Sequence, residues 1–390
     1  GPNDPGILVT QSIHKQQAGF SQASMILKKD SHIKGQKRYV SHKILNNSFM
    51  INASTSPNYQ IFASIDINTK MQAGEMGKLL WHECMVNAIE VRKSVIHHCK
   101  YLRPIVPPVV HDMKWEEGDT EKMADDIAYF AFEPGGKWHS FQGYAKGQYF
   151  IDPMKLQLMT PGINVENGEY EDFGIPGIIL ADYLRDNMII PEKCDLNDIL
   201  FLMTPAESKV KLDNLLSRLV QFENHIDKDS PMEEVIPSIY RKYENRYQGY
   251  TIRKLCSELH NFYKEKKINV IQKKMFLKSY FPEYFMKPQT ANWAMVRGEG
   301  ELIPLKEAEG RVALQVAVPY PPGVPCVLPG ERWNRIAMDY FLDFVEMAND
   351  LPGFFPEMQG VYLEKDKAGM ISVYCYVLNK KYENRYKNKT

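Results

Sequence analysis

The sequence predicts an α/β fold, because short apolar runs typical of strands recur between longer segments with helical periodicity. The strand-like runs are residues 7–9, 155–159 and 199–203. Residues 74–103 carry apolar side chains at three- and four-residue spacing, which indicates a long amphipathic helix. A second stripe of this kind lies within residues 212–222, where it predicts helix core rather than a ligand site.

Residues 1–73 begin with the first strand, which a Pro-Gly pair precedes as a turn signal. A basic loop is expected over residues 28–43. We expect a helix to begin at the run 54–57, with Thr55 or Ser56 as its N-cap and a proline in its first turn.

Residues 104–229 combine extended and helical patterns. The segment 105–110 is expected to be extended and irregular, and residues 149–151 have the composition of a strand that precedes the one at 155–159. An Ile-Pro pair opens a predicted helix over residues 175–187. This part of the chain is therefore expected to be an α/β unit of its own.

Residues 230–390 are rich in aromatic residues and prolines. Apolar residues within 340–348 indicate one amphipathic helix, whereas the prolines of 319–329 predict an extended connection. The hexapeptide Lys-Tyr-Glu-Asn-Arg-Tyr occurs twice, at 242–247 and 381–386. No longer period surrounds it, so it does not indicate a repeat protein.

Charge and cysteine content exclude several classes of protein. The 48 basic and 48 acidic residues balance, so no net positive field favours nucleic acid or an anionic membrane as partner. No apolar run approaches the ~20 residues that span a bilayer. The six cysteines are scattered without a Cys-x-x-Cys motif, which indicates reduced thiols and a cytoplasmic protein.

No metal or nucleotide motif is complete. The His-Glu pair at His82 lacks the second histidine of a zinc motif, because Val86 stands in its place. The consecutive residues 97–99 (His-His-Cys) point in different directions on a helix and do not share one metal. A Gly-x-Gly run from Gly298 lacks the third glycine, because Ile303 stands there. We therefore predict no metal site.

Lys15 gives the strongest indication of chemistry. It follows the first predicted strand, which we expect to be buried, and it lies among small and hydroxyl residues in the run 10–22. A desolvated lysine amine is a nucleophile, and hydroxyl groups nearby suit a phosphate. An enzyme that uses pyridoxal 5′-phosphate (PLP) requires this combination. The pattern Ser-x-His-Lys alone has little specificity, whereas the thirteen-residue run has much more.

The run 10–22 resembles the cofactor-lysine segment of the bacterial ornithine/lysine/arginine decarboxylases, which have the aspartate-aminotransferase fold. Segments along the whole chain resemble the same family: Ala53-Ser54-Thr55-Ser56-Pro57, Leu158-Met159-Thr160-Pro161-Gly162, Phe173-Gly174-Ile175-Pro176, Pro319-Tyr320-Pro321-Pro322-Gly323-Val324-Pro325 and Pro329-Gly330-Glu331. Two segments most resemble the ornithine branch: Gln16-Gln17-Ala18-Gly19 and Glu192-Lys193-Cys194-Asp195.

The resemblance implies roles for five residues. Lys15 would bind PLP covalently, while Ser12 and His14 would bind the cofactor phosphate. Ser54 would reach the phosphate bound in a neighbouring subunit, which would make the active form at least a homodimer. Glu192 would contact the distal amine of the substrate, because a carboxylate is the natural partner of an alkyl ammonium.

Each polar residue also has a plain structural interpretation. Ser12 would be a strand-end serine, and His14 a core histidine with its hydrogen bonds satisfied. Ser54 would be a helix cap. Glu192 would be an exposed carboxylate paired with Lys193.

The resemblance also implies three domains. Residues 1–73 would be the C-terminal part of a PLP-binding large domain, 74–229 an aminotransferase-like small domain, and 230–390 an α+β decarboxylase C-terminal domain. In this fold, the aspartate that pairs with the pyridine nitrogen lies upstream of the cofactor lysine. We therefore expect this chain to be the C-terminal half of the enzyme and to require an upstream half, because an uncovered half-sheet is prone to aggregation.

The function implied is decarboxylation of L-ornithine to putrescine and carbon dioxide, for polyamine biosynthesis or acid stress. Lysine or arginine as the substrate of the same chemistry is one alternative. A non-catalytic subunit that keeps the fold for assembly or regulation is another.

Overall fold

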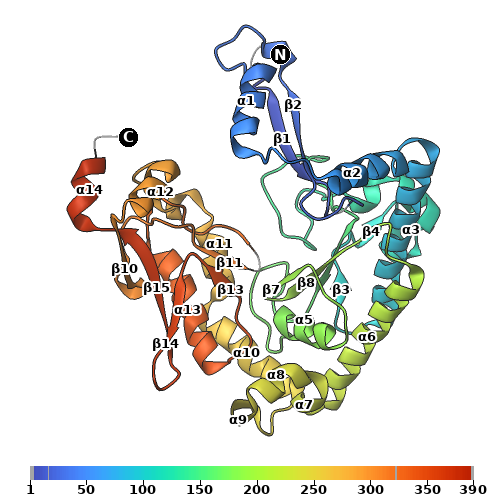
Figure 1. Cartoon of the computed structure of the whole chain (residues 1–390). Coiled ribbons are helices and arrows are strands. Elements are labelled where there is room, and N and C mark those ends of the chain that lie inside the picture. Colours follow the sequence, from blue (N-terminus) through green and yellow to red (C-terminus); the bar gives the residue numbers. More distant parts are fainter. Residues whose placement is uncertain (1–3, 16, 321–322, 388–390) are drawn as a thin grey trace.

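The computed structural model describes residues 4–15, 17–320 and 323–387. Gln16 and the pair Pro321-Pro322, which belong to the segments compared above, lie outside the described residues. Figure 1 shows an N-terminal hairpin with two helices, a central sheet beside the longest helix, and a C-terminal part of helices and short strands. The predicted α/β fold is confirmed.

The N-terminal part is built on a two-stranded antiparallel ribbon. Its pairing runs in register from Ile7 opposite Lys29 to Ser12 opposite Ser24. Asparagine and serine side chains cap the two helices that follow, which satisfies backbone N–H groups in their first turns. The elements are β1 (Ile7–Ser12), β2 (Ser24–Lys29), α1 (His42–Asn52) and α2 (Tyr59–Met71).

Three predictions for this part were wrong. The first strand is exposed rather than buried: the side chains of Ile7 and Leu8 are 54% and 59% exposed, because neither face of the ribbon is covered. The basic loop is partly ordered, since it contains the end of β2 and the start of α1. The second helix begins at Tyr59 with Asn58 as its cap, so Thr55 and Ser56 do not cap it.

Helix α3 (Gly74–His98) is the long helix predicted from residues 74–103. Its buried stripe includes Cys84, Ala88 and Val95, at helical spacing. Gly77 lies close to the backbone of Gln72, where a Cβ would come within 2.1 Å of the Gln72 carbonyl oxygen. A glycine is therefore required where α3 turns away from the end of α2.

The central sheet has the strand order β3-β6-β8-β7, and all of its neighbours are antiparallel. Its strands alternate between buried and half-buried residues, as one-sided packing requires. Helix α5 contacts β7 and β8, and α6 contacts α3 and α5. The elements are β3 (Arg103–Pro104), β6 (Lys155–Met159), α5 (Gly177–Asp186), β7 (Lys193–Asp195), β8 (Asp198–Leu202) and α6 (Lys209–Lys228).

A lobe of short elements lies between β3 and β6 around the buried Trp115. The strand predicted at residues 149–151 does not form: Phe150 makes one isolated bridge to Ala131, because this segment belongs to an aromatic loop rather than to a sheet. The lobe contains β4 (Val109–Val110), β5 (Met113–Lys114), η2 (Trp115–Glu117), α4 (Thr120–Asp125) and η3 (Ile127–Phe130).

The C-terminal part combines helices with a sheet of order β10-β15-β14. Helix α13 (Arg335–Asp350) confirms the helix expected around residues 340–348. The helices are α7 (Met232–Val235), α8 (Pro237–Lys242), α9 (Glu244–Tyr247), α10 (Ile252–Lys266), α11 (Ile268–Met275), η4 (Lys278–Tyr280), α12 (Pro288–Val296), η5 (Leu305–Glu307) and α14 (Lys380–Tyr386). The strands are β9 (Glu283–Tyr284), β10 (Gly300–Pro304), β11 (Val318–Tyr320), β12 (Glu331–Arg332), β13 (Glu357–Gln359), β14 (Tyr362–Lys365) and β15 (Ile371–Leu378).

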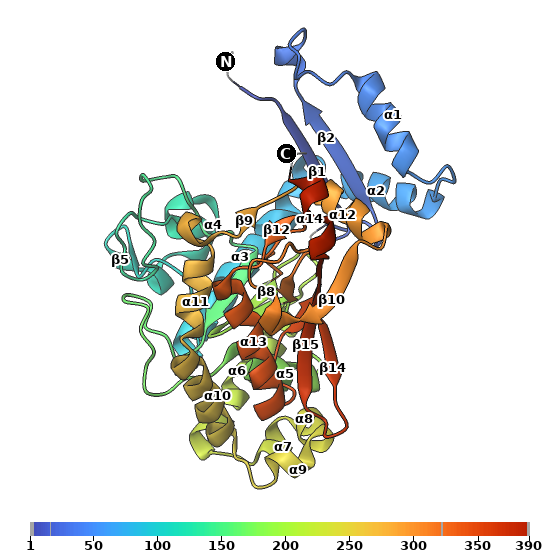
Figure 2. The same ribbon diagram turned by 90° about the vertical axis from the view of Figure 1, so that its left-hand side faces the viewer.

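One apolar core joins the central sheet to the C-terminal part. It extends from Cys84 on α3, through Phe222 on α6, to Phe341 on α13 and Val377 on β15. The N-terminal ribbon contributes nothing to it; Figure 2 shows β1, β2 and α1 projecting from one end of the molecule. The described helices include none that is long and apolar enough to cross a membrane. The three-domain division remains a prediction.

Leu219→Ala is expected to reduce the free energy of unfolding by about 2–5 kcal/mol, because Leu219 on α6 is fully buried and the smaller side chain leaves a cavity. Val210→Ala on the same helix is the control: Val210 is 77% exposed, so we expect a change within about 0.5 kcal/mol. Urea denaturation followed by circular dichroism measures both. Equal losses in the two variants would contradict this account of the core.

Candidate functional site

The loop between β1 and β2 carries Lys15 and is anchored on both sides of it. Ile13 is buried, and its N–H donates to the carbonyl of Ala23 at 3.0 Å. His14 Nδ1 lies 2.8 Å from the same carbonyl oxygen. A carbonyl only accepts, so Nδ1 carries the proton and donates, which leaves Nε2 without a hydrogen-bond partner among the described residues. The position of His14 is therefore fixed while one ring nitrogen stays available.

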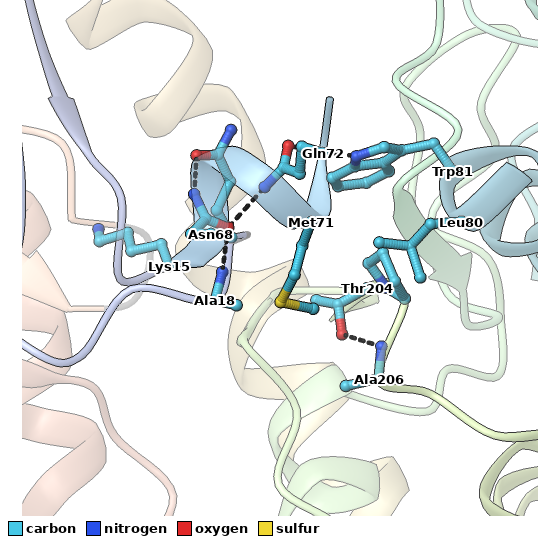
Figure 3. A pocket seen from close by; sticks show the side chains of 11 residues that line it. Lys15, Ala18, Asn68, Met71, Gln72, Leu80, Trp81, Thr204 and Ala206 are labelled. Carbon is cyan, nitrogen blue, oxygen red and sulfur yellow. Dashed lines mark hydrogen bonds between the residues drawn. The ribbon is translucent and has the colours of Figure 1, made fainter. Parts of the chain in front are cut away.

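Lys15 is exposed and lines a cavity of about 320 Å³. Within the described part of the chain, no group hydrogen-bonds to or forms an ion pair with its Nζ. Figure 3 shows the amine pointing away from Trp81 and Thr204, which line the opposite side. An unpaired primary amine at the edge of a cavity is free to react with a carbonyl compound.

A chain of amide groups holds this loop against α2. Asn68 Oδ1 accepts the backbone N–H of Ala18 at 3.0 Å, and Asn68 Nδ2 donates to Gln17 Oε1 at 3.1 Å. Gln72 Nε2 donates to Asn68 Oδ1 at 2.6 Å, and Trp81 Nε1 donates to Gln72 Oε1 at 3.3 Å (Figure 3). The cavity wall is thus connected from the Lys15 loop through α2 to α3.

Sequence analysis did not identify these wall residues. Ser64 and Asn68 on α2 and Gln72, the residue at its C-cap, recur at every fourth position, so they lie along one polar stripe. Ser64 Oγ accepts the Phe20 N–H at 3.0 Å, which attaches the loop at a second point. A polar stripe on a helix that is otherwise rich in apolar residues was the sequence pattern from which these wall residues could have been predicted.

Ser12 and Ser54 lie apart from the cavity wall. Ser12 is exposed on β1, where it pairs with Ser24 at the end of the ribbon. Ser54 is exposed between α1 and α2, and among the described residues its Oγ accepts only the local N–H of Ser56, at 3.2 Å. Neither serine lines the cavity, and Ser54 does not cap α2. Their cofactor roles therefore remain predictions.

Glu192 does not line the cavity but lies on the central sheet that leads to it. Its N–H donates to Leu200 O at 2.8 Å, which continues the β7–β8 ladder. Its carboxylate pairs with Lys155 Nζ at 2.9 Å, not with Lys193 as the structural interpretation proposed. Two residues beyond the end of β8, Thr204 forms part of the cavity.

Two aspartates occupy the β7–β8 turn beside Glu192. Burial raises the pKa of Asp198 to about 6, the charge of Asp195 adds to the effect, and hydrogen bonds from Gln157 and the backbone oppose it. Burial likewise raises the pKa of Asp195, whose carboxylate accepts from Gln272 on α11 at 3.1 Å. The turn therefore joins the sheet to the C-terminal part through the hydrogen bond between Asp195 and Gln272.

The described residues contain no group of three or more His, Cys, Asp or Glu side chains placed to hold a metal ion. The six cysteines are free and buried. Burial raises the pKa of their thiols; for Cys84 it reaches about 11. The available chemistry is therefore that of the lysine, histidine, hydroxyl and carboxylate groups above.

Comparison with known proteins gives two family matches. Residues 1–211 match the sequence model of the Orn/Lys/Arg decarboxylase major domain, and residues 269–379 match that of the Orn/Lys/Arg decarboxylase C-terminal domain. The chain belongs to the ornithine/lysine/arginine decarboxylase family. The resemblance drawn from the sequence is thereby confirmed.

Relatives within the family differ in their similarity to this chain. It is 54% identical to the ornithine decarboxylase of Haemophilus influenzae over 96% of its length, and 56% identical to the constitutive ornithine decarboxylase of Escherichia coli over the same share. It is 32% identical to a lysine decarboxylase of Pseudomonas aeruginosa, again over 96%. These matches cover 52%, 53% and 48% of the relatives, so the chain spans about half their length.

Solved structures of the family have the same fold. Lysine decarboxylase A from P. aeruginosa superposes with a TM-score of 0.84 at 29% identity, over 97% of this chain and 50% of that one. The E. coli constitutive lysine decarboxylase superposes with a TM-score of 0.82 at 28% identity, over 96% of this chain and 50% of that one.

Asp198→Asn is expected to change how stability depends on pH. The folded-state pKa lies above the ordinary value of 3.8, so the penalty for burying the carboxylate is absent below pH 4 and fully present above pH 6. The variant lacks this penalty. Its stability relative to the parent should therefore be more favourable at pH 7 than at pH 4, as measured by urea denaturation at both values.

Asp213→Asn, on the exposed face of α6, is the control. Its free energy of unfolding should differ from that of the parent by the same amount at both pH values. If Asp198→Asn behaved like Asp213→Asn, Asp198 would not be the buried acid described here.

Proposed function

We propose that this chain forms part of a PLP-dependent decarboxylase that converts L-ornithine to putrescine and carbon dioxide. The observation that carries the proposal is the unpaired Lys15 amine at the edge of a cavity, in a loop that also presents His14. Ornithine is favoured over lysine because identity is 54–56% to the ornithine decarboxylases above and 32% to the lysine decarboxylase. Six free cysteines support a cytoplasmic location.

The donor set on this chain fits PLP. Lys15 Nζ is free to bond to the cofactor carbonyl carbon. His14 has one ring nitrogen held by Ala23 and one open, which when protonated donates to a phosphate. The Ser12 hydroxyl, on the strand that leads into the same loop, supplies a further donor. Amine, imidazole and hydroxyl groups are the set that a phosphorylated aldehyde needs.

PLP, when bound, supplies an electron sink for the pair left behind when the Cα–carboxylate bond breaks. Residues of the chain would bind the cofactor and the substrate and would transfer the proton. Lys15 Nζ would hold the cofactor covalently and would return a proton to Cα. Glu192 Oε1 and Oε2 accept the distal ammonium of the substrate. Each turnover thus releases carbon dioxide and consumes one proton.

The proposal includes protein partners. Nine apolar side chains are exposed on β1, β2 and α1, on both faces of the ribbon, and we call them the apolar N-terminal surface: Ile7, Leu8, Val9, Ile26, Leu27, Ile44, Phe49, Met50 and Ile51. Exposed apolar side chains in this number indicate a protein interface. The occupant we propose is the part of the family's sequence that lies outside the matched half. Pairing of two such assemblies would let Ser54 reach the neighbouring phosphate.

Co-expression with the first half of the E. coli constitutive ornithine decarboxylase tests the occupant. We expect a stable 1:1 complex on affinity purification. Leu27→Glu should weaken it about tenfold or more, because an unpaired charge would be buried. Val210→Glu, exposed on α6 away from this surface, should leave it unchanged. Absence of a complex, or equal effects of the two substitutions, would refute the proposed interface.

Lys15→Ala in the assembled enzyme is expected to reduce kcat about a hundredfold or more, because Cα loses its proton donor and the cofactor its attachment. Lys228→Ala, an exposed lysine at the C-terminal end of α6, is the control and should retain activity. Carbon dioxide release from ornithine, lysine and arginine gives kcat/KM for each, and ornithine should be highest. Borohydride reduction and peptide mapping should find the pyridoxyl group on Lys15.

A pyridoxyl group on another residue would refute the role of Lys15. A higher kcat/KM for lysine or arginine would refute the substrate. A complete assembly without activity would support the non-catalytic alternative.

A further inference from the structure

Glu192 holds an ammonium group that belongs to the protein itself. Lys155 Nζ lies 2.9 Å from Glu192 Oε2 and 3.3 Å from Oε1, so it contacts both carboxylate oxygens. The two side chains are 34% and 36% exposed, which leaves the pair open to solutes. A primary ammonium on this carboxylate is the same chemical group that the proposed substrate would bring.

The backbone under this pair is fixed on both sides. Lys155 pairs with Leu202, and Glu192 donates to Leu200, so the two side chains reach across β8 from its two neighbouring strands. The Lys155 carbonyl accepts from Nη2 of Arg92 at 2.8 Å, and Arg92 is almost fully buried. The pair is therefore built into the sheet rather than formed by two mobile surface side chains.

β8 connects the pair to the cavity wall. Thr204, which lines the cavity with Lys15, follows Leu202 by two residues, and Leu202 lies opposite Lys155. The ion pair and the cavity wall are therefore joined by one short segment of backbone.

We propose that Lys155 is a competing cation that occupies Glu192 until the distal ammonium of a substrate displaces it. The inference rests on the proposed role of Glu192 in substrate binding. Lys155 then acts as a residue that sets the affinity for the distal ammonium, because a primary ammonium replaces it donor for donor on the carboxylate. Its presence lowers the affinity for every cationic side chain and keeps the empty carboxylate neutralised.

Lys155→Met tests the inference, since methionine keeps the apolar stem and removes the charge. In the assembled enzyme, KM for ornithine should fall about two- to five-fold with kcat within twofold, the range expected for a partly exposed ion pair. Lys155→Arg should restore the parent KM. Lys193→Met, at an exposed neighbour whose ammonium forms no ion pair with Glu192 among the described residues, is the control and should leave KM unchanged.

Glu192→Gln separates this inference from the function on which it rests. It should raise KM for ornithine, and Lys155→Met should then have no further effect in that background. If Glu192→Gln leaves KM unchanged, the substrate-binding role of Glu192 and the inference both fail. If Glu192→Gln raises KM but Lys155→Met does not lower it, only the inference is overturned.

Binding of putrescine, measured by calorimetry, provides a readout that does not depend on turnover. Lys155→Met should tighten binding by a similar factor, and Lys155→Gln serves as the neutral substitute if the methionine variant does not fold. Unchanged or weaker binding in the folded neutral variant would overturn the inference.

Discussion

The hydrogen bonds of Asn68 are the constraint on which the site depends. Its side chain is 4% exposed and makes three contacts: Oδ1 accepts from Ala18 and Gln72, and Nδ2 donates to Gln17. A buried amide with its partners present stabilises by about 1 kcal/mol per bond, and losing a partner costs about 1–3 kcal/mol. The loop that carries Lys15 is exposed, so little apolar packing holds it. Its attachment to α2 therefore depends mainly on hydrogen bonds, those of Asn68 and that of Ser64 with the Phe20 N–H.

The two faces of the central sheet differ in burial and polarity. On β6 and β8, Leu156, Leu158, Ile199 and Phe201 are buried in the main core. The intervening residues, among them Lys155 and Gln157, lie on the opposite, half-buried face. Because side chains alternate along a strand, polar groups placed on one face do not disturb the packing of the other. The Lys155–Glu192 pair and the hydrogen-bonded Asp198 are thus held by a rigid apolar layer beneath them.

Periodicity in the sequence predicted the elements that have one strongly apolar face. Helices α3, α5, α6 and α13 and strands β6 and β8 appear where the patterns indicated, because burial of that face decides their structure. The same reasoning failed at residues 149–151, where aromatic side chains stack within a loop. It also misplaced the start of α2. Several neighbouring residues can serve as an N-cap, and in the structure it is the Asn58 side chain that accepts the Ile61 N–H.

The sequence pointed to only some of the candidate site residues. Some of these residues are close together in the sequence, whereas others are brought to the cavity by tertiary packing. Lys15 and His14 are local in sequence, so a short motif identified them. Asn68 and Thr204 reach the cavity through helix packing and strand order, which no local pattern encodes. The repeated hexapeptide shows that local sequence does determine local structure. Both copies are largely helical, and both bury their last tyrosine, Tyr247 and Tyr386.

The apolar N-terminal surface and the Lys15 loop belong to the same small unit, and this links the two parts of the proposed function. β1 leads directly into the loop, and no residue of β1 joins the described core. A protein surface that covers β1 would also exclude water from the neighbouring Lys15. Removal of water disfavours the ammonium relative to the free amine, and the free amine is the nucleophile. Assembly would therefore both cover the apolar strand and exclude water from Lys15, the residue proposed to bind the cofactor.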